Sequence, residues 1–193
     1  MYLVTIEGID GSGKSTLFER LKECYKRDNV DYVKFPGGYF FNHYRDNLTD
    51  EEIEELQQKD KRIIYEWGRN KQLDVLIGDR GEVSQKVYNG TDKTSIESDL
   101  VIYLDIDIEE AFKRIDVRGE EDNLGFENKD VLTEKKKRYE EVLEKEYKDK
   151  VVRFYIKGNM FEDINGKQKN LQEVVTCIEK ELDNLRVNED EST

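Results

Sequence analysis

Short apolar runs alternate along the chain with longer stretches in which an apolar residue recurs every three or four positions. The short runs are rich in Val, Ile, Leu and Tyr and are typical of buried β-strands, whereas the longer stretches are typical of amphipathic helices. This alternation predicts an α/β fold with a parallel sheet. The predicted strands are 2–6, 31–35, 74–78, 99–106 and 151–156, and the predicted helices are 14–27, about 50–72, 82–89, 108–117, 129–148 and 170–186.

The domain organisation follows from the same pattern. The 193 residues contain no internal repeat and no Gly/Ser/Pro-rich linker, and they are enough to bury a sizeable core. We therefore expect a single domain over residues 1–186, followed by a disordered, polar and acidic tail at 187–193. Thr49 and Glu52 have the spacing of a capping box and predict the start of the helix after the second strand.

The charge balance restricts the partners. With 32 Lys and Arg against 45 Asp and Glu, the formal net charge is −13. Such an acidic exterior repels polyanions, so we expect neither a nucleic acid nor a membrane as a partner, and any bound anion requires a local cluster of cations.

The cysteine and histidine content and the hydropathy narrow the class of protein further. Two distant cysteines and one histidine predict neither a disulfide framework nor a metal cluster. No apolar run approaches the length of a membrane span, and the first residues enter a predicted strand at once, without a signal-peptide pattern. We therefore expect a cytoplasmic protein.

The segment GIDGSGKS (8–15) fits the P-loop pattern G-x-x-x-x-G-K-[ST], and it lies between a predicted strand and a predicted helix, as the motif requires. Glycines allow the loop to turn its backbone N–H groups towards phosphate oxygens, the lysine reaches the β- and γ-phosphates, and the serine hydroxyl binds Mg²⁺. The sequence thus predicts ATP binding with Mg²⁺. The predicted ATP-binding residues are Gly8, Gly11, Ser12, Gly13, Lys14, Ser15 and Thr16.

Charged and aromatic residues at other strand ends predict a second, acceptor site. Asp79 and Arg80 follow the apolar run of the third strand, where ligands bind in parallel sheets. Tyr65 and Arg69 are one helical turn apart and share a face. Taken alone, Asp79–Arg80 could be a structural ion pair and Tyr65 a core aromatic.

Five segments follow one another in an informative order: EGIDGSGKST (7–16), FPGG (35–38), the pair Tyr65 and Arg69, DRGEVSQKVY (79–88) and KRIDVRGEED (113–122). Together they resemble the thymidylate kinase family, from about residue 1 to about 147 and weakly again over 164–175. The resemblance implies a three-layer P-loop fold with a five-stranded parallel sheet in the order 2-3-1-4-5, flanked by helices, and a short lid at about 114–128. It also implies a homodimer.

The resemblance assigns roles to the acceptor residues. Arg80 would bind the 5′-phosphate of the acceptor, Tyr65 would stack on thymine, and Tyr88 would lie under the sugar, where it would disfavour a 2′-hydroxyl. The implied acceptor-binding residues are Asp10, Phe35, Tyr65, Arg69, Arg80, Ser84, Gln85 and Tyr88, the metal-binding residues Ser15, Asp10 and Asp79, and the catalytic residues Lys14, Arg80, Asp10, Arg118 and Arg114.

Some positions depart from the family pattern. Gly81 stands where an aromatic residue is usual, which predicts a looser acceptor pocket, and Asn123 stands where some members carry a lid arginine. That second departure favours Arg118 as the lid cation, although Arg114 and Arg118 could also be solvated charges at a helix end, and Gln85 a surface residue. Members with Phe-Pro after the second strand often have a cis bond, so we predict one at Phe35–Pro36.

The predicted reaction is transfer of the γ-phosphoryl group of ATP to dTMP, giving dTDP and ADP. A monophosphate acceptor has a second pKa of about 6 and needs no general base, only cations that hold two anions together. Kinases of dUMP, of a 5-modified deoxyuridylate or of several deoxynucleotides remain open, because a pocket discriminates weakly against one methyl group. A deoxynucleoside kinase and a non-catalytic nucleotide-binding protein are the further alternatives.

Overall fold

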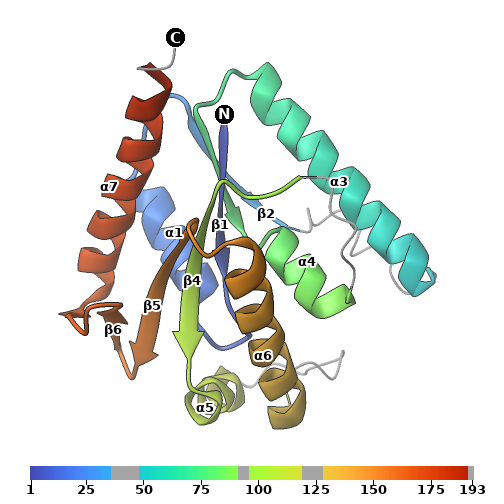
Figure 1. Ribbon diagram of the computed structural model, residues 1–193, viewed down its shortest axis with the longest axis vertical. Helices are drawn as coiled ribbons and strands as arrows, with labels where there is room; N and C mark the ends of the chain where they lie inside the picture. Colours follow the sequence, from blue (N-terminus) through green and yellow to red (C-terminus); the bar gives the residue numbers. More distant parts are fainter. Residues whose placement is uncertain (36–47, 91–95, 119–127, 191–193) are drawn as a thin grey trace.

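The computed structural model describes residues 1–35, 48–90, 96–118 and 128–190, and these form one sheet flanked by helices (Figure 1). The sheet has seven strands in the order β2-β3-β1-β4-β5-β6-β7. The strands are β1 Tyr2–Glu7, β2 Val30–Lys34, β3 Val75–Asp79, β4 Leu100–Ile106, β5 Val151–Lys157, β6 Met160–Asp163 and β7 Gln168–Lys169. The helices are α1 Lys14–Cys24, α3 Asp50–Asn70, α4 Glu82–Asn89, α5 Ile108–Arg118, α6 Lys129–Glu146 and α7 Leu171–Asp190.

The first five strands are parallel and lie in the predicted order. The predicted strand number was wrong, because β6 pairs antiparallel with β5, and β7 antiparallel with β6. Both strands come from a segment without a clear apolar alternation. The chain reverses at Gly158 and Gly166, which have φ angles of 55° and 77° that favour glycine, and the paired backbone groups then complete the sheet.

Helices cover both faces of the sheet (Figure 1). The helix α1 packs with α7, and α4 packs with α6, while α5 lies beyond the carboxyl end of β4. The buried strands β1, β3 and β4 supply much of the core, as expected for parallel strands with both faces covered. A smaller cluster of Leu3, Phe35, Leu73 and Leu76 packs under α3.

The helix ends agree with most of the expected boundaries. The capping box is confirmed: the Thr49 hydroxyl accepts a hydrogen bond from the Glu52 N–H at 3.3 Å, and the Thr49 N–H donates to the Glu52 carboxylate at 2.8 Å. The first helix stops at Cys24, three residues earlier than predicted, whereas α7 continues to Asp190, into the segment expected to be a tail. None of the described helices has the length and apolarity of a membrane span.

Candidate active site

The P-loop has the backbone geometry that its glycines predict. Gly11 and Gly13 have φ angles of 80° and 88°, in the left-handed region. A Cβ atom on Gly11 would lie only 2.6 Å from the carbonyl oxygen of Ala111, at the start of α5. The loop therefore packs directly against the α5 backbone, and a larger residue at position 11 would separate the two.

The Lys14 side chain is buried within this loop. Its ammonium group donates hydrogen bonds to the carbonyl oxygens of Gly8 at 2.7 Å and Ile9 at 2.8 Å. Burial lowers the pKa of Lys14 to about 8, and the neighbouring Arg80 cation acts in the same direction. Lys14 thus lies where phosphates bind a P-loop, in a site that already holds excess positive charge.

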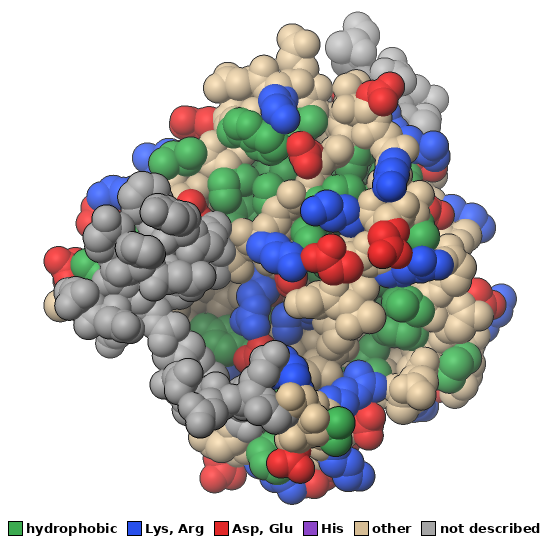
Figure 2. All heavy atoms as spheres, turned by 180° about the vertical axis from the view of Figure 1, so that it is seen from behind, with side chains coloured by type: hydrophobic (Ala, Val, Ile, Leu, Met, Phe, Trp, Pro, Cys, Tyr) green, Lys and Arg blue, Asp and Glu red, His purple; other side chains and the backbone are tan. Residues whose placement is uncertain are grey.

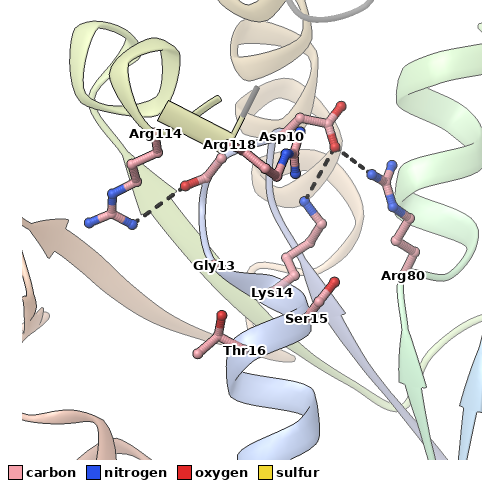
Figure 3. Close-up of a pocket in the computed structure, with 9 residues that line it drawn as sticks. Asp10, Gly13, Lys14, Ser15, Thr16, Arg80, Arg114 and Arg118 are labelled. Carbon is pink, nitrogen blue, oxygen red and sulfur yellow. Dashed lines mark hydrogen bonds and ion pairs between the residues drawn. The ribbon is translucent and has the colours of Figure 1, made fainter. Parts of the chain in front are cut away.

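Asp10 connects the P-loop to Arg80. One carboxylate oxygen lies 3.9 Å from the Lys14 ammonium and accepts a hydrogen bond from the Arg80 guanidinium (Figure 3). The other oxygen accepts a hydrogen bond from the Tyr88 hydroxyl at 2.8 Å. Burial alone would raise the pKa of Asp10, but Arg80 and Lys14 hold it below its usual value. The carboxylate is therefore an anion placed between two cations.

Arg80 follows the last residue of β3 and has a φ angle of 71°, which is uncommon for a residue with a side chain. Its backbone N–H donates to the carbonyl oxygen of Ile6 in β1 at 3.0 Å. Its guanidinium carbon lies 5.3 Å from the centre of the Tyr88 ring, in a cation–π contact. In the structure the Arg80 side chain is thus held by Asp10 and Tyr88.

A cavity of about 310 Å³ joins these residues. Arg114 and Arg118 reach it from α5 (Figure 3). The Arg114 guanidinium donates to the carbonyl oxygens of Gly11 and Gly158. On the face drawn in Figure 2, several Lys and Arg side chains gather near the middle, although the protein is acidic overall. The predicted residues that line the cavity are Asp10, Gly11, Gly13, Lys14, Ser15, Thr16, Arg80, Arg114 and Arg118.

Ser15 and Asp79 supply oxygen atoms that suit a magnesium ion. The Ser15 hydroxyl donates to one carboxylate oxygen of Asp79 at 3.0 Å, while the other oxygen is buried without a hydrogen-bond partner among the described residues. No group of three His, Cys, Asp or Glu side chains forms a metal site within the described ranges. This donor set fits Mg²⁺, which binds few protein oxygens and completes its shell with water and phosphate.

The residues expected around the acceptor base differ in burial. Phe35 is buried, Tyr65 packs partly buried against the same small cluster, and Arg69 is exposed one turn further along α3. Gln85 has a buried side-chain oxygen without a partner in the described part of the chain. The Phe35–Pro36 bond and residues 119–127 of the expected lid, which include Asn123, lie outside the described residues.

Ser84, which the resemblance places among the acceptor-binding residues, is not one of the residues that line the cavity. Its side chain is buried, and its hydroxyl contacts the carboxylate of Glu7 and, at 2.8 Å, the hydroxyl of Tyr139. The reason is that this side of α4 faces β1 and α6. Gly81 does not leave open space either, because a Cβ atom there would lie 2.5 Å from the Thr5 methyl group.

Three buried acids had no role assigned from the sequence: Glu7, Glu82 and Asp105. Glu7, the last residue of β1, is fully buried beside Ser84, and burial raises its pKa to about 7. Glu82 forms a buried ion pair with Lys61 at 3.3 Å and accepts hydrogen bonds from Ser98. The signal for Glu7 was present: like Asp79, it is a charged residue that ends an otherwise apolar strand.

A P-loop lysine and a second group of cations facing one cavity are typical of a P-loop kinase, an enzyme that transfers a phosphoryl group from a nucleoside triphosphate to an acceptor. The family model described as Thymidylate kinase matches residues 6–164. The chain belongs to the thymidylate kinase family, and it is a phosphotransferase whose family reaction is the phosphorylation of dTMP by ATP.

Relatives and solved structures agree with this family. A probable thymidylate kinase of Metallosphaera sedula is 34% identical over 146 residues, which cover 67% of this chain and 72% of the relative. A thymidylate kinase of Clostridium novyi is 24% identical over 197 residues, which cover 84% of this chain and 96% of the relative. The structure of thymidylate kinase from Candida albicans, at 18% identity, has a TM-score of 0.67 and covers 96% of this chain and 93% of its own, which shows the shared fold.

Proposed function

We propose that the protein catalyses in-line transfer of the γ-phosphoryl group of ATP to dTMP and uses Arg80 to hold the acceptor phosphate. The observation that carries this proposal is the single cavity lined by both the P-loop and Arg80, with Asp10 between Lys14 and Arg80. Two phosphate groups that bind these two cations come close together. A phosphoryl group could then move between them without a large rearrangement.

On the donor side, the P-loop glycines and Ser12 present backbone N–H groups to the phosphates of ATP, and Lys14 neutralises charge on the β- and γ-phosphates. Ser15 and Thr16 lie in the first turn of α1, whose N-terminus adds a partial positive charge. Ser15 and Asp79, together with Asp10, would hold Mg²⁺, which supplies positive charge to the phosphates. Because the Lys14 pKa is only about 8, the bound phosphates also keep this lysine protonated.

On the acceptor side, Arg80 replaces its contact with Asp10 by charge-assisted hydrogen bonds to the 5′-phosphate. Asp10 is then available for the 3′-hydroxyl or the metal, and Tyr88 packs beneath the sugar. Tyr65 and Phe35 contact the base. Arg69 and Gln85 extend this set at the base edge, Arg69 from α3 and Gln85 from α4.

Arg114 and Arg118 are proposed to stabilise the charge of the transferring phosphoryl group, because both side chains reach the cavity from the end of α5. Closure of the lid would exclude water and so prevent wasteful hydrolysis of ATP. We further propose that the protein forms a homodimer. We also propose that it acts inside the cell, where both substrates are formed, and that it binds neither nucleic acid nor a membrane.

The test is a coupled assay of ADP release with ATP and Mg²⁺ against dTMP, dUMP, UMP, dCMP, dGMP and thymidine. We expect dTMP to be phosphorylated well above UMP and thymidine, since the first comparison reports the sugar and the second reports the acceptor phosphate. Comparable rates with dUMP or several deoxynucleotides would keep the reaction but widen the base specificity. Activity on thymidine without activity on dTMP would overturn the proposal in favour of a deoxynucleoside kinase.

A further inference from the structure

The carboxylate of Glu7 is an acceptor for several donors from other elements. The Ser84 hydroxyl donates to Oε2, the Ser84 backbone N–H lies 3.4 Å from Oε1, and the Tyr139 hydroxyl lies 3.3 Å from Oε2. All three residues are buried. This cluster therefore joins the end of β1, the first turn of α4 and the middle of α6.

The contact with the Ser84 N–H replaces a missing helix cap. The helix α4 begins at Glu82, and its N-cap residue, Gly81, has no side chain that could accept the free N–H groups of the first turn. Ser84 is the third residue of the helix, at the position whose N–H a capping side chain usually binds. Glu7 supplies that acceptor from another strand.

The glycine at position 81 is what allows this arrangement. A Cβ atom there would lie 2.5 Å from the Thr5 methyl group and 3.3 Å from Oε1 of Glu7. A side chain at this position would thus push the start of α4 away from β1 and lengthen the contact between Glu7 and Ser84.

The start of α4 in turn determines where Arg80 lies. Arg80 directly precedes Gly81, and its N–H is hydrogen-bonded to Ile6 of β1. Its guanidinium packs on Tyr88, near the other end of α4, and both side chains contact Asp10. A shift of α4 relative to β1 would therefore move the Tyr88 ring away from the arginine that it orients.

We propose that Glu7 is a positioning residue for the acceptor site: by joining the start of α4 to the end of β1 through Ser84 and Tyr139, it keeps Arg80 and Tyr88 in the geometry that binds the acceptor phosphate and sugar. The inference rests on the proposed function, because it takes Arg80 as the phosphate ligand. Hydrogen bonding, rather than charge, is the property it requires. Burial raises the pKa of Glu7 to about 7, so the protonated and ionised forms are both populated near neutral pH.

The test compares two substitutions of similar size. In Glu7→Gln the amide oxygen can still accept from the Ser84 N–H and the amide N–H₂ can donate to the hydroxyls, whereas Glu7→Leu removes every hydrogen bond. We expect Glu7→Leu to raise the KM for dTMP roughly tenfold, equivalent to about 1.4 kcal/mol, with the KM for ATP changed by less than about twofold. We expect Glu7→Gln to restore the KM for dTMP to within about threefold of the wild-type value.

Two further variants keep the test decisive where Glu7→Leu folds poorly, as judged by circular dichroism. Ser84→Ala and Tyr139→Phe each remove one hydroxyl from the network, and each is expected to raise the KM for dTMP in the same direction but by less. Equal changes in both KM values, or no change in either, would overturn the inference. Arg80→Ala is measured in parallel: if it leaves the KM for dTMP unchanged, the proposed function fails first, independently of Glu7.

Discussion

Replacement of Arg80 tests the acceptor site most directly. A hydrogen bond to a charged group contributes about 1.5–3 kcal/mol, so a bidentate contact with phosphate would contribute about 3–6 kcal/mol. Part of this binding free energy is offset, because the phosphate must displace the Asp10 carboxylate, which is already hydrogen-bonded to the Arg80 guanidinium. We therefore expect Arg80→Ala to lose about 2–4 kcal/mol of transition-state binding, a roughly 30- to 1,000-fold drop in kcat/KM for dTMP.

ATP binding should respond differently to the same substitution. Arg80 is one cause of the lowered pKa of Lys14, so its removal raises that pKa and favours the protonated lysine at neutral pH. Asp10 remains as the compensating anion, 3.9 Å from the lysine. We thus expect the dissociation constant of ATP to stay the same or to decrease slightly.

The assay measures kcat/KM for dTMP by coupled ADP release and ATP affinity by calorimetry, with Arg80→Gly as a matched variant. Both variants lack the guanidinium, but glycine relieves the left-handed backbone at φ 71°, so Arg80→Gly should be about 1 kcal/mol more stable to urea than Arg80→Ala. Parallel losses of ATP and dTMP binding would refute the assignment of Arg80 to the acceptor. Equal stability of the two variants would refute the backbone argument alone.

Three other perturbations have defined outcomes. Gly11→Ala places a methyl group 2.6 Å from the Ala111 carbonyl oxygen in a backbone that favours glycine, so it should destabilise the protein by about 1–3 kcal/mol and weaken ATP binding, measured by urea unfolding and ATP titration. Lys61→Met leaves Glu82 buried without its cation and should cost about 3–5 kcal/mol in the free energy of unfolding. The pKa of Glu7 is raised from 4.5 to about 7 on folding, so its contribution to stability is complete below pH 4.5 and is lost as the pH rises through 7. The free energy of unfolding should therefore fall between about pH 4.5 and 7 in the wild type relative to Glu7→Gln. Parallel curves would contradict this.

The parts of the fold that sequence predicts well are those with local signals. The P-loop could be placed from its spacing between a strand and a helix, and each of the five parallel strands had an apolar run of its own. Their order came from family resemblance. The strands β6 and β7 were missed because they are short and half exposed, and their pairing depends on two glycine turns rather than on alternating apolar residues.

In the candidate site, too, the residues with a local sequence signal could be predicted, whereas those defined by contacts between distant segments could not. Asp79 and Arg80 could be singled out because charged residues at the end of an apolar strand are unusual. Ser84 and Tyr88, both on α4, were assigned to the acceptor site by the family resemblance alone. Yet the neighbours of Ser84 are Glu7 and Tyr139, which lie 77 and 55 residues away in the chain. Such long-range contacts leave no periodic trace in a single sequence.

The two short antiparallel strands also determine what the sheet offers to other molecules. Without them, the seven-residue strand β5 would present its outer row of N–H and C=O groups to solvent, a template for pairing with another chain. Instead, β6 pairs with Phe154–Lys157 of β5, and the sheet ends in β7, which has only two residues. The hairpin therefore protects the chain against edge-to-edge aggregation. Variants that delete it should accumulate in the insoluble fraction during expression even though the catalytic cavity lies on other strands.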